Sequence, residues 1–174
     1  GDISKQNFPY LDRSEVDPIF IASNCIIIEK DLWRMWYTSN TQWELNGTRP
    51  APRYHIKYAE SSNGKDWNRE GRVAIDFLDP SEYAISRPWV IKDKNRYKMW
   101  YSCRGDNYKI GYAESPDGYN WNRLDKNVGI EPSLKGFDSQ MIEYAAVVSC
   151  RGQNYLFYNG NNFGEGGIGL AVEV

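Results

Sequence analysis

Residues 96–123 read RYKMWYSCRGDNYKIGYAESPDGYNWNR, and most of this stretch occurs a second time in the chain. The other copy reads LWRMWYTS at residues 32–39 and YHIKYAESSNGKDWNR at residues 54–69. Both copies contain residues that alternate with the period of two typical of a β-strand. Both also contain an Asn-Gly or Asp-Gly dipeptide, which suits a tight hairpin turn. A repeat of this length predicts one supersecondary unit that is stacked several times.

The repeat and its flanks predict three units of short β-strands. The first unit has expected strands at 22–29, 33–38 and 54–60, a loop at 39–53 and a short fourth strand at Trp67. The second has expected strands at 85–92, 97–102 and 108–114 and ends at Trp121. The third has expected strands at 141–148, 154–159 and 167–173, and no segment has the pattern of a long helix.

These units indicate the fold class. Four-stranded units with an Asx-Gly hairpin and a Trp at a fixed offset are typical of β-propeller blades. We therefore predict an all-β fold, a β-propeller of four-stranded antiparallel blades, with about three blades in this chain. The 174 residues form a single domain whose blade units span roughly 19–76, 84–125 and 138–174. Trp36 and Trp100 lie inside alternating strands, so we expect them in the core between blades.

Composition and charge limit the classes of partner. The net charge is −2 and acidic and basic residues are interspersed, so no basic patch predicts binding to nucleic acid. No apolar run approaches the roughly 20 residues that span a membrane, and the first residues lack a signal-peptide pattern. These features predict a soluble chain without a membrane partner and favour a cytoplasmic location. Three widely spaced cysteines and one histidine predict no metal site, and we expect no cofactor.

The beginnings of the first strands are the expected binding end of the propeller. The first strand of each blade lines the central channel, so the residues that begin these strands should converge although they are far apart in sequence. Counting back from the second strands aligns Ser23, Ser86 and Glu143 at one position. The next position holds Asn24, Arg87 and Tyr144.

Four segments carry a resemblance to a known superfamily. They read SRPWVIKDKNRYKMWYSCRG, YKIGYAESPDGYNWNR, GFDSQMIEY and YLFYNGNNFGEGGIGLAV, and together they cover most of residues 86–172. The pattern resembles the five-bladed β-propeller glycosidase-like superfamily, which includes glycoside hydrolase families 32, 43 and 130 and sugar-related propeller proteins. The resemblance implies a carbohydrate ligand that is bound or cleaved at the end of the channel. It is also compatible with a non-catalytic sugar-binding or assembly module of a polysaccharide-related system.

The resemblance implies a catalytic role for one glutamate. Glu143 stands two positions before the small residue Ala145 at the start of a first strand, where family 43 has its general acid. The positions of the partner carboxylates of that family hold Asn24 and Arg87 here. Glycoside hydrolysis ordinarily needs two carboxyl groups. The second one would come from Asp138, from Asp106 or from blades outside this chain.

The remaining candidates would contact the ligand. Arg87 could bind a carboxylate or phosphate with its planar fork of donors, or it could form an ion pair with Glu143. Asp138 could contact a ligand or stabilise an Asx turn. Trp43, in the expected loop, could stack on a ligand or a partner. Ser86 and Asn24 could hydrogen-bond sugar hydroxyls or satisfy backbone groups at the channel. Ser23 and Tyr144, at the same first-strand positions, are expected to contact the sugar.

Three units are too few for a five-bladed ring. Open sheet edges have to be paired or covered. The sequence therefore predicts either further blades in a longer chain or a homo-oligomer in which blades of different copies complete one another.

Overall fold

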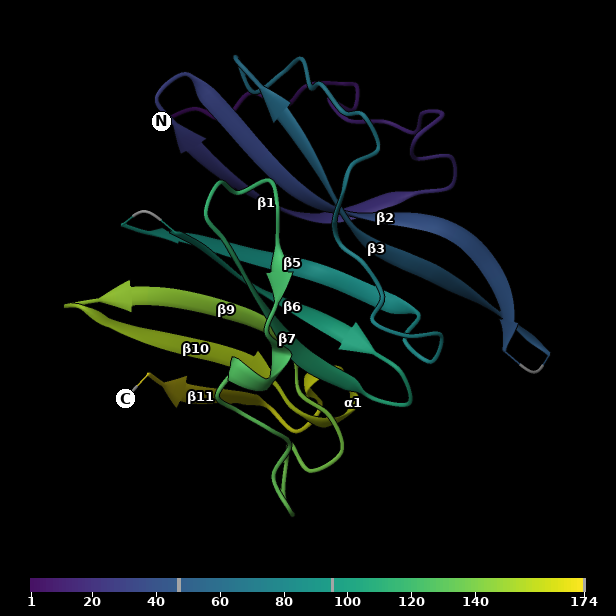
Figure 1. The fold of residues 1–174 in the computed structure, drawn as a ribbon, viewed down its shortest axis with the longest axis vertical. Coiled ribbons are helices and arrows are strands. Elements are labelled where there is room, and N and C mark those ends of the chain that lie inside the picture. Colours follow the sequence, from purple (N-terminus) through teal and green to yellow (C-terminus); the bar gives the residue numbers. More distant parts are fainter. Residues whose placement is uncertain (47, 95, 174) are drawn as a thin grey trace.

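The computed structural model describes residues 1–46, 48–94 and 96–173. Its regular secondary structure is almost wholly β-strand, arranged in three blades that lie one after another from the N-terminal to the C-terminal end (Figure 1). Blade 1 holds β1 (Ile21–Glu29), β2 (Leu32–Asn46), β3 (Arg49–Ser61) and β4 (Val73–Ile75). Blade 2 holds β5 (Ala84–Asp93), β6 (Arg96–Arg104), β7 (Tyr108–Ser115) and β8 (Asn122–Arg123). Blade 3 holds β9 (Glu143–Cys150), β10 (Gln153–Asn159) and β11 (Ile168–Val172).

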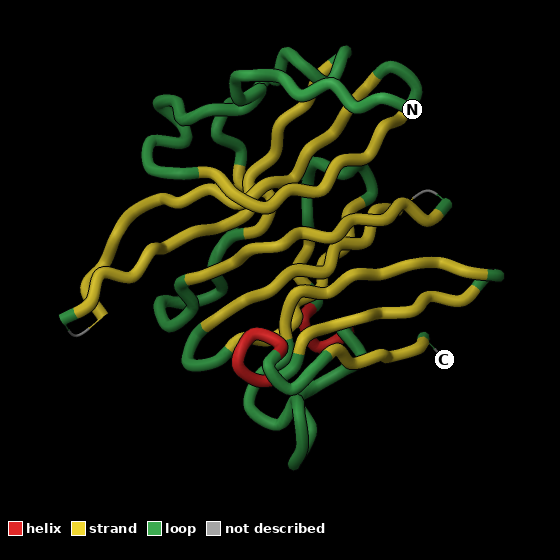
Figure 2. Tube along the Cα trace, turned by 180° about the vertical axis from the view of Figure 1, so that it is seen from behind, coloured by secondary structure: helices red, strands yellow, loops and turns green. Residues whose placement is uncertain are grey.

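Two short helical turns are the remaining regular elements of the described residues, η1 (Asp125–Asn127) and α1 (Asn161–Gly164) (Figure 2). Within blades 1 and 2 the strands pair antiparallel, and one parallel pair, Tyr54 with Ala84, joins β3 to β5. Blade 3 is a separate sheet in the order β11-β10-β9. The prediction of an all-β chain with about three propeller blades is confirmed. In the part of the chain that the structure describes, no helix has the length and apolar character needed to cross a membrane.

The prediction of a loop at residues 39–53 is wrong. Strands β2 and β3 continue as a long hairpin, in which Trp43 pairs with Pro52 and Leu45 with Pro50. A proline cannot donate a backbone hydrogen bond, and sequence reasoning therefore excluded a strand here. In this hairpin β3 pairs with β5 only at Tyr54, so residues 49–53 form an edge on which a missing N–H is tolerated.

The fourth strand of blade 1 also differs from the prediction. Trp67 lies outside any strand, while Asn68 forms an isolated bridge with Glu60. The strand β4 follows at Val73–Ile75 and pairs with β3.

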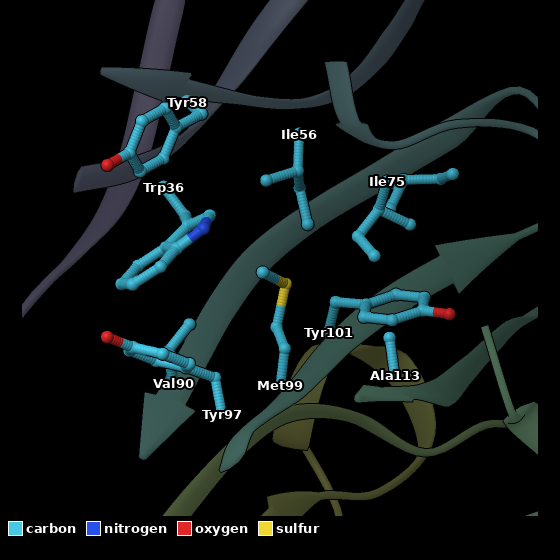
Figure 3. Close-up of a cluster of buried hydrophobic side chains, with 10 residues drawn as sticks. Trp36, Ile56, Tyr58, Ile75, Val90, Tyr97, Met99, Tyr101 and Ala113 are labelled. Carbon is cyan, nitrogen blue, oxygen red and sulfur yellow. The ribbon is translucent and has the colours of Figure 1, made fainter. Parts of the chain in front are cut away.

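The predicted inter-blade tryptophans are confirmed. Trp36 is fully buried and packs with Val90, Tyr97 and Met99 of blade 2, as Figure 3 shows. Trp100 packs in the same way with residues of the third blade, including Val147 and Leu156. Alternate residues of blade 2 therefore face blade 1 and blade 3, which explains the period-two pattern in the repeat.

The repeated Asp-Gly turn has a structural role. The Ser115 hydroxyl accepts hydrogen bonds from the backbone N–H groups of Asp117 and Gly118. The indole of Trp36, in the neighbouring blade, donates to the Gly118 carbonyl at 3.1 Å. Gly118 has a φ of 73°, and a Cβ at this position would lie 3.1 Å from the Tyr97 ring. The turn thus needs glycine both for its conformation and for its close packing on Tyr97 within blade 2.

A tyrosine–aspartate hydrogen bond occurs in every blade. The tyrosines occupy equivalent positions on the second strands, and each hydroxyl donates to an aspartate outside those strands. The three pairs are Tyr37 with Asp17, Tyr101 with Asp125, and Tyr158 with Asp138. Each bond ties a segment flanking the blade to the centre of its sheet.

Asp17 has the most extensive set of partners. Its fully buried carboxylate accepts from Tyr37 at 2.9 Å and from Ser39 at 2.6 Å, and it lies 3.2 Å from Lys57 and 3.0 Å from Arg69. Burial alone would raise the pKa of Asp17, but the two hydroxyl bonds and the Lys57 charge outweigh burial and lower it. The carboxylate therefore stays ionised and holds the N-terminal segment against blade 1.

We expect Asp17→Asn to lower the free energy of unfolding by about 3–5 kcal/mol, because the substitution leaves the Lys57 and Arg69 charges without their partner. Urea denaturation of the wild type and the variant measures the loss. Glu70→Gln, at an exposed carboxylate, is the matched control. Equal losses in both variants would contradict a central role for Asp17.

Candidate functional site

The strands β5 and β9 each carry an irregularity where the candidate residues lie. On β5, Ser86 pairs with Ser102, and the pairing then resumes only at Trp89. The corresponding shift on β9 lies between Glu143 and Ala146. Arg87 and Tyr144 follow Ser86 and Glu143 and have φ values of 54° and 56°, which are uncommon for residues other than glycine. A bulge of this kind changes the direction of its side chains, and bulges occur often beside functional sites.

The predicted register is correct for blades 2 and 3 and wrong by one residue for blade 1. Ala22 pairs with Thr38 as Ser86 pairs with Ser102. Ala22 is therefore the residue equivalent to Ser86 and Glu143, and Ser23 is equivalent to Arg87 and Tyr144. The hairpins between the first and second strands of all three blades have two residues between their last pairs. The variable turn length assumed from sequence does not exist.

Glu143 is the most deeply placed of the candidates. Its exposed fraction is 0%, and neither carboxylate oxygen has a hydrogen-bond partner among the residues that the structure describes. Burial raises the pKa of Glu143 to about 7, although Tyr144 and the charges of Arg104 and Arg87 act to lower it. The carboxyl group is thus protonated in a large share of molecules near neutral pH.

Aromatic rings and two arginines surround this position. The guanidinium carbon of Arg87 lies 4.5 Å from the centre of the Tyr144 ring. Tyr144 and Tyr108 have ring centres 6.3 Å apart, and the Arg104 guanidinium carbon lies 5.1 Å from the Tyr108 ring. The hydroxyls of Tyr108 and Tyr54 are 2.7 Å apart. The result is a polar and aromatic assembly built from blades 1, 2 and 3.

Sequence reasoning missed Arg104, Tyr108 and Tyr54. A usable signal was present, because Tyr54 and Tyr108 occupy the same position in the two copies of the repeat. Tyr54 lies within β3 and pairs with Ala84 of β5, and Tyr108 begins β7, where its carbonyl accepts from the N–H of Ile142. Arg104 pairs with Tyr108 and is the residue of blade 2 that corresponds to Asn40 of blade 1.

Ser23 and Asn24 do not meet Glu143 in the way that was predicted. The Ser23 hydroxyl lies 2.9 Å from that of Thr38 and accepts from the backbone N–H of Arg87 at 3.2 Å. It thereby satisfies a backbone group at the bulge of the next blade. Asn24 is exposed and borders a hollow of about 310 Å³ beside Tyr10 and Trp67, on the face of blade 1 that does not pack on blade 2.

Ser86, Asp138 and Trp43 have different surroundings. Ser86 is buried beside the Arg87 bulge. The Asp138 carboxylate is also buried and accepts from Tyr158 at 2.8 Å. Trp43 lies on the extended hairpin, with 53% of its surface exposed and its ring 6.2 Å from that of Phe20.

The ion pair between Arg87 and Glu143, one of the two alternatives from the sequence, is not found. In the described part of the chain no carboxylate lies within 4.0 Å of the Arg87 guanidinium.

His55 contacts Asp76, and no cluster of three metal-ligating His, Cys, Asp or Glu side chains occurs among the described residues.

Solved structures of glycoside hydrolases share this arrangement of blades. The chain superimposes on a protein described as "Glycoside hydrolase" with a TM-score of 0.70 and 19% identity, covering 98% of this chain and 50% of the other. It matches Zg3597, a family 117 glycoside hydrolase from the marine bacterium Zobellia galactanivorans, with a TM-score of 0.71 and 22% identity, over 93% of this chain and 55% of that one. The chain has the fold of a glycosidase-type β-propeller. The resemblance inferred from sequence is confirmed at the level of the fold.

The curated sequence relatives are longer than this chain. "Uncharacterized protein Rv1502" of Mycobacterium tuberculosis strain H37Rv is 40% identical over 165 residues, which are 95% of this chain and 54% of the relative. "Uncharacterized protein MT1551" of strain CDC 1551 gives the same identity and coverage. The chain therefore spans about half the length of the curated relatives it matches. No family model matches it.

The raised pKa of Glu143 predicts a pH-dependent stability difference for Glu143→Gln. Below about pH 4.5, the ordinary pKa of the group, both the folded and unfolded wild-type chains are protonated. As the pH rises to about 7, the unfolded chain ionises first, so the wild type loses stability relative to the variant. We expect the variant to gain up to about 3 kcal/mol relative to the wild type between pH 4 and pH 8.

Urea denaturation at several pH values measures this change. Glu131→Gln replaces an exposed carboxylate and should show no such trend. A difference between wild type and Glu143→Gln that is constant with pH would contradict the raised pKa.

Proposed function

We propose that this chain binds a glycoside where β5 and β9 begin and that Glu143 donates a proton to the glycosidic oxygen during cleavage. The observation that carries the proposal is the fully buried Glu143 carboxyl without a hydrogen-bond partner in the described residues. Its pKa of about 7 keeps a proton available near neutral pH, as a general acid requires. The likeness to glycoside hydrolases supports a carbohydrate-related role.

Cleavage also needs a base or nucleophile. Asp138, which was a candidate, is bound by Tyr158 as Asp17 is by Tyr37 and Asp125 by Tyr101, so we assign it a structural role. The positions equivalent to Glu143 hold Ala22 and Ser86 in the other blades. We therefore propose that the second carboxyl group required for hydrolysis lies outside this chain.

A non-catalytic sugar-binding module is the second candidate function. It is favoured by the uncharged residues that stand at the Glu143-equivalent positions of blades 1 and 2. In that case a protonated Glu143 would donate a hydrogen bond to a sugar hydroxyl without any transfer of the proton.

Turnover of aryl glycosides with good and poor leaving groups separates the two functions. The assay uses the protein at the full length encoded by its gene. We expect Glu143→Gln to lower kcat by about 10²–10⁴ for poor leaving groups, which need a proton, and much less for dinitrophenyl glycosides. Glu131→Gln is the control and should retain the wild-type rates.

An equal loss for all leaving groups would contradict an acid role for Glu143. Sugar binding by a wild-type protein that turns over none of the glycosides would favour the binding module instead.

The outer face of blade 3 carries exposed apolar side chains and supports a proposal about what covers it. Phe157, Ile168 and Leu170 have exposed fractions of 40%, 74% and 52%. Their pairing shows that they are equivalent to Trp100, Ile110 and Tyr112, which are buried between blades 2 and 3. In blades 1 and 2 the residues at these positions pack against the next blade of the chain. In blade 3 the residues at the same positions are exposed.

We propose that a further blade of the same polypeptide covers this face. The length of the relatives, about twice that of this chain, favours this occupant over a second copy of the chain. Apolar side chains on an uncovered sheet face are otherwise a site of association.

Leu170→Lys tests this proposal in two chain lengths. In the full-length gene product the new charge would be buried between blades, so we expect a loss of at least about 2 kcal/mol in the free energy of unfolding. In the 174-residue chain the same substitution should cost much less, because Leu170 is exposed there. Leu134→Lys, in an exposed loop, is the control in both lengths.

Equal effects in the two lengths would contradict a covering blade. A dimer of the 174-residue chain that Leu170→Lys dissociates would assign the face to a second copy.

A further inference from the structure

Arg104, near Glu143, differs from most of the other half-buried arginines in the protein, and Arg87 beside it is exposed. Four of those have a carboxylate within 3.5 Å, namely Arg34, Arg53, Arg69 and Arg123. Neither Arg87 nor Arg104 has a carboxylate within 4.0 Å among the residues that the structure describes. Two positive charges at the candidate site thus form no ion pair within the described residues.

Arg104 has an unmet hydrogen-bonding requirement. Its Nε is buried, and no acceptor for it occurs in the described part of the chain. The guanidinium carbon lies 5.1 Å from the Tyr108 ring and 5.6 Å from the Tyr83 ring, so aromatic faces flank the charge. A buried charged donor without an acceptor is costly, and an anionic oxygen from a ligand would relieve that cost.

Arg87 is held in place by its backbone. The residue has a φ of 54°, and its N–H donates to Ser23 in the neighbouring blade. Its guanidinium lies against the Tyr144 ring, while the side chain remains accessible to solvent. The cationic fork is therefore positioned in advance and open to a ligand.

A pair of tyrosines connects the two arginines. Arg87 lies over Tyr144 and Arg104 over Tyr108, and the ring centres of these tyrosines are 6.3 Å apart. Both guanidiniums are near enough to act on the Glu143 carboxyl electrostatically. Even when Glu143 is ionised, its single negative charge balances only one of the two guanidiniums. The site is positive although the chain as a whole has a net charge of −2.

We infer that the sugar recognised at this site is anionic, with a carboxylate or phosphate group bound by Arg87 and Arg104. This inference rests on the proposed function, because it names the substrate class of the same site. The guanidinium fork matches the geometry of both anions. The aromatic rings beside it can pack against the apolar face of a sugar.

Matched sugar pairs test the charge preference. The full-length protein is titrated with glucose, glucuronic acid and glucose 6-phosphate, and with the corresponding galactose and mannose derivatives, by calorimetry and saturation-transfer NMR at low salt. We expect at least one charged member to bind about tenfold or more tightly than its neutral parent. The tighter of the two charged forms identifies the anion as carboxylate or phosphate.

Substitutions of the two arginines test whether their side chains cause the preference for charged sugars. Arg104→Gln and Arg87→Gln should each reduce the preference for the charged sugar, and Arg104→Lys should restore only part of it because lysine lacks the fork. Arg49→Gln, at an exposed arginine of the β2–β3 hairpin, is the control. Arg87 is exposed, so its variant remains informative if Arg104→Gln fails to fold.

Equal binding of charged and neutral sugars, or a preference that survives in both glutamine variants, would overturn the inference and leave the proposed function intact. Binding of no sugar in the panel would overturn both.

Discussion

A hydrogen bond from a tyrosine hydroxyl to an aspartate ties a flanking segment to the second strand of each blade. In all three blades the tyrosine lies at the same place on the second strand, while the aspartate comes from a different part of the chain. Asp17 precedes its blade, Asp125 follows the last strand of its blade, and Asp138 lies in the loop that leads into β9. Each pair satisfies two polar groups at once, which are buried in the Tyr37–Asp17 pair and partly buried in the other two pairs.

The hydrogen bonds from tyrosine distinguish the structural carboxylates from the candidate functional carboxyl group of Glu143. Asp17 and Glu143 are both fully buried, yet the pKa of Asp17 is lowered and that of Glu143 is raised. The difference comes from the donors around Asp17, since the Glu143 oxygens have no hydrogen-bond partner in the described residues. A buried carboxyl without partners does not stabilise a fold. Its position at the beginning of β9, beside Arg87 and Arg104, is the reason for proposing that a ligand binds there.

Much of the fold could be predicted from repeated residues. The two copies of the Trp-Tyr and Tyr-Ala-Glu-Ser patterns predicted the strands of blades 1 and 2, and Trp36 and Trp100 lie between blades as expected. The β2–β3 hairpin was missed because Pro50 and Pro52 are tolerated only on an edge, and an edge is a property of the assembled sheet. The register of β1 was misplaced because sequence does not show turn lengths or bulges directly.

The sequence by itself determined the blade repeat, the inter-blade tryptophans and Glu143 as the carboxylate at the start of a first strand. These features depend on local alternation and on residues that recur at fixed spacing. Only the tertiary structure decided that Asp138 accepts a hydrogen bond from Tyr158. It also decided that Arg104, Tyr108 and Tyr54 lie together at the candidate site. Those contacts link residues from different blades, and their hydrogen bonds and burial exist only when the blades are packed together.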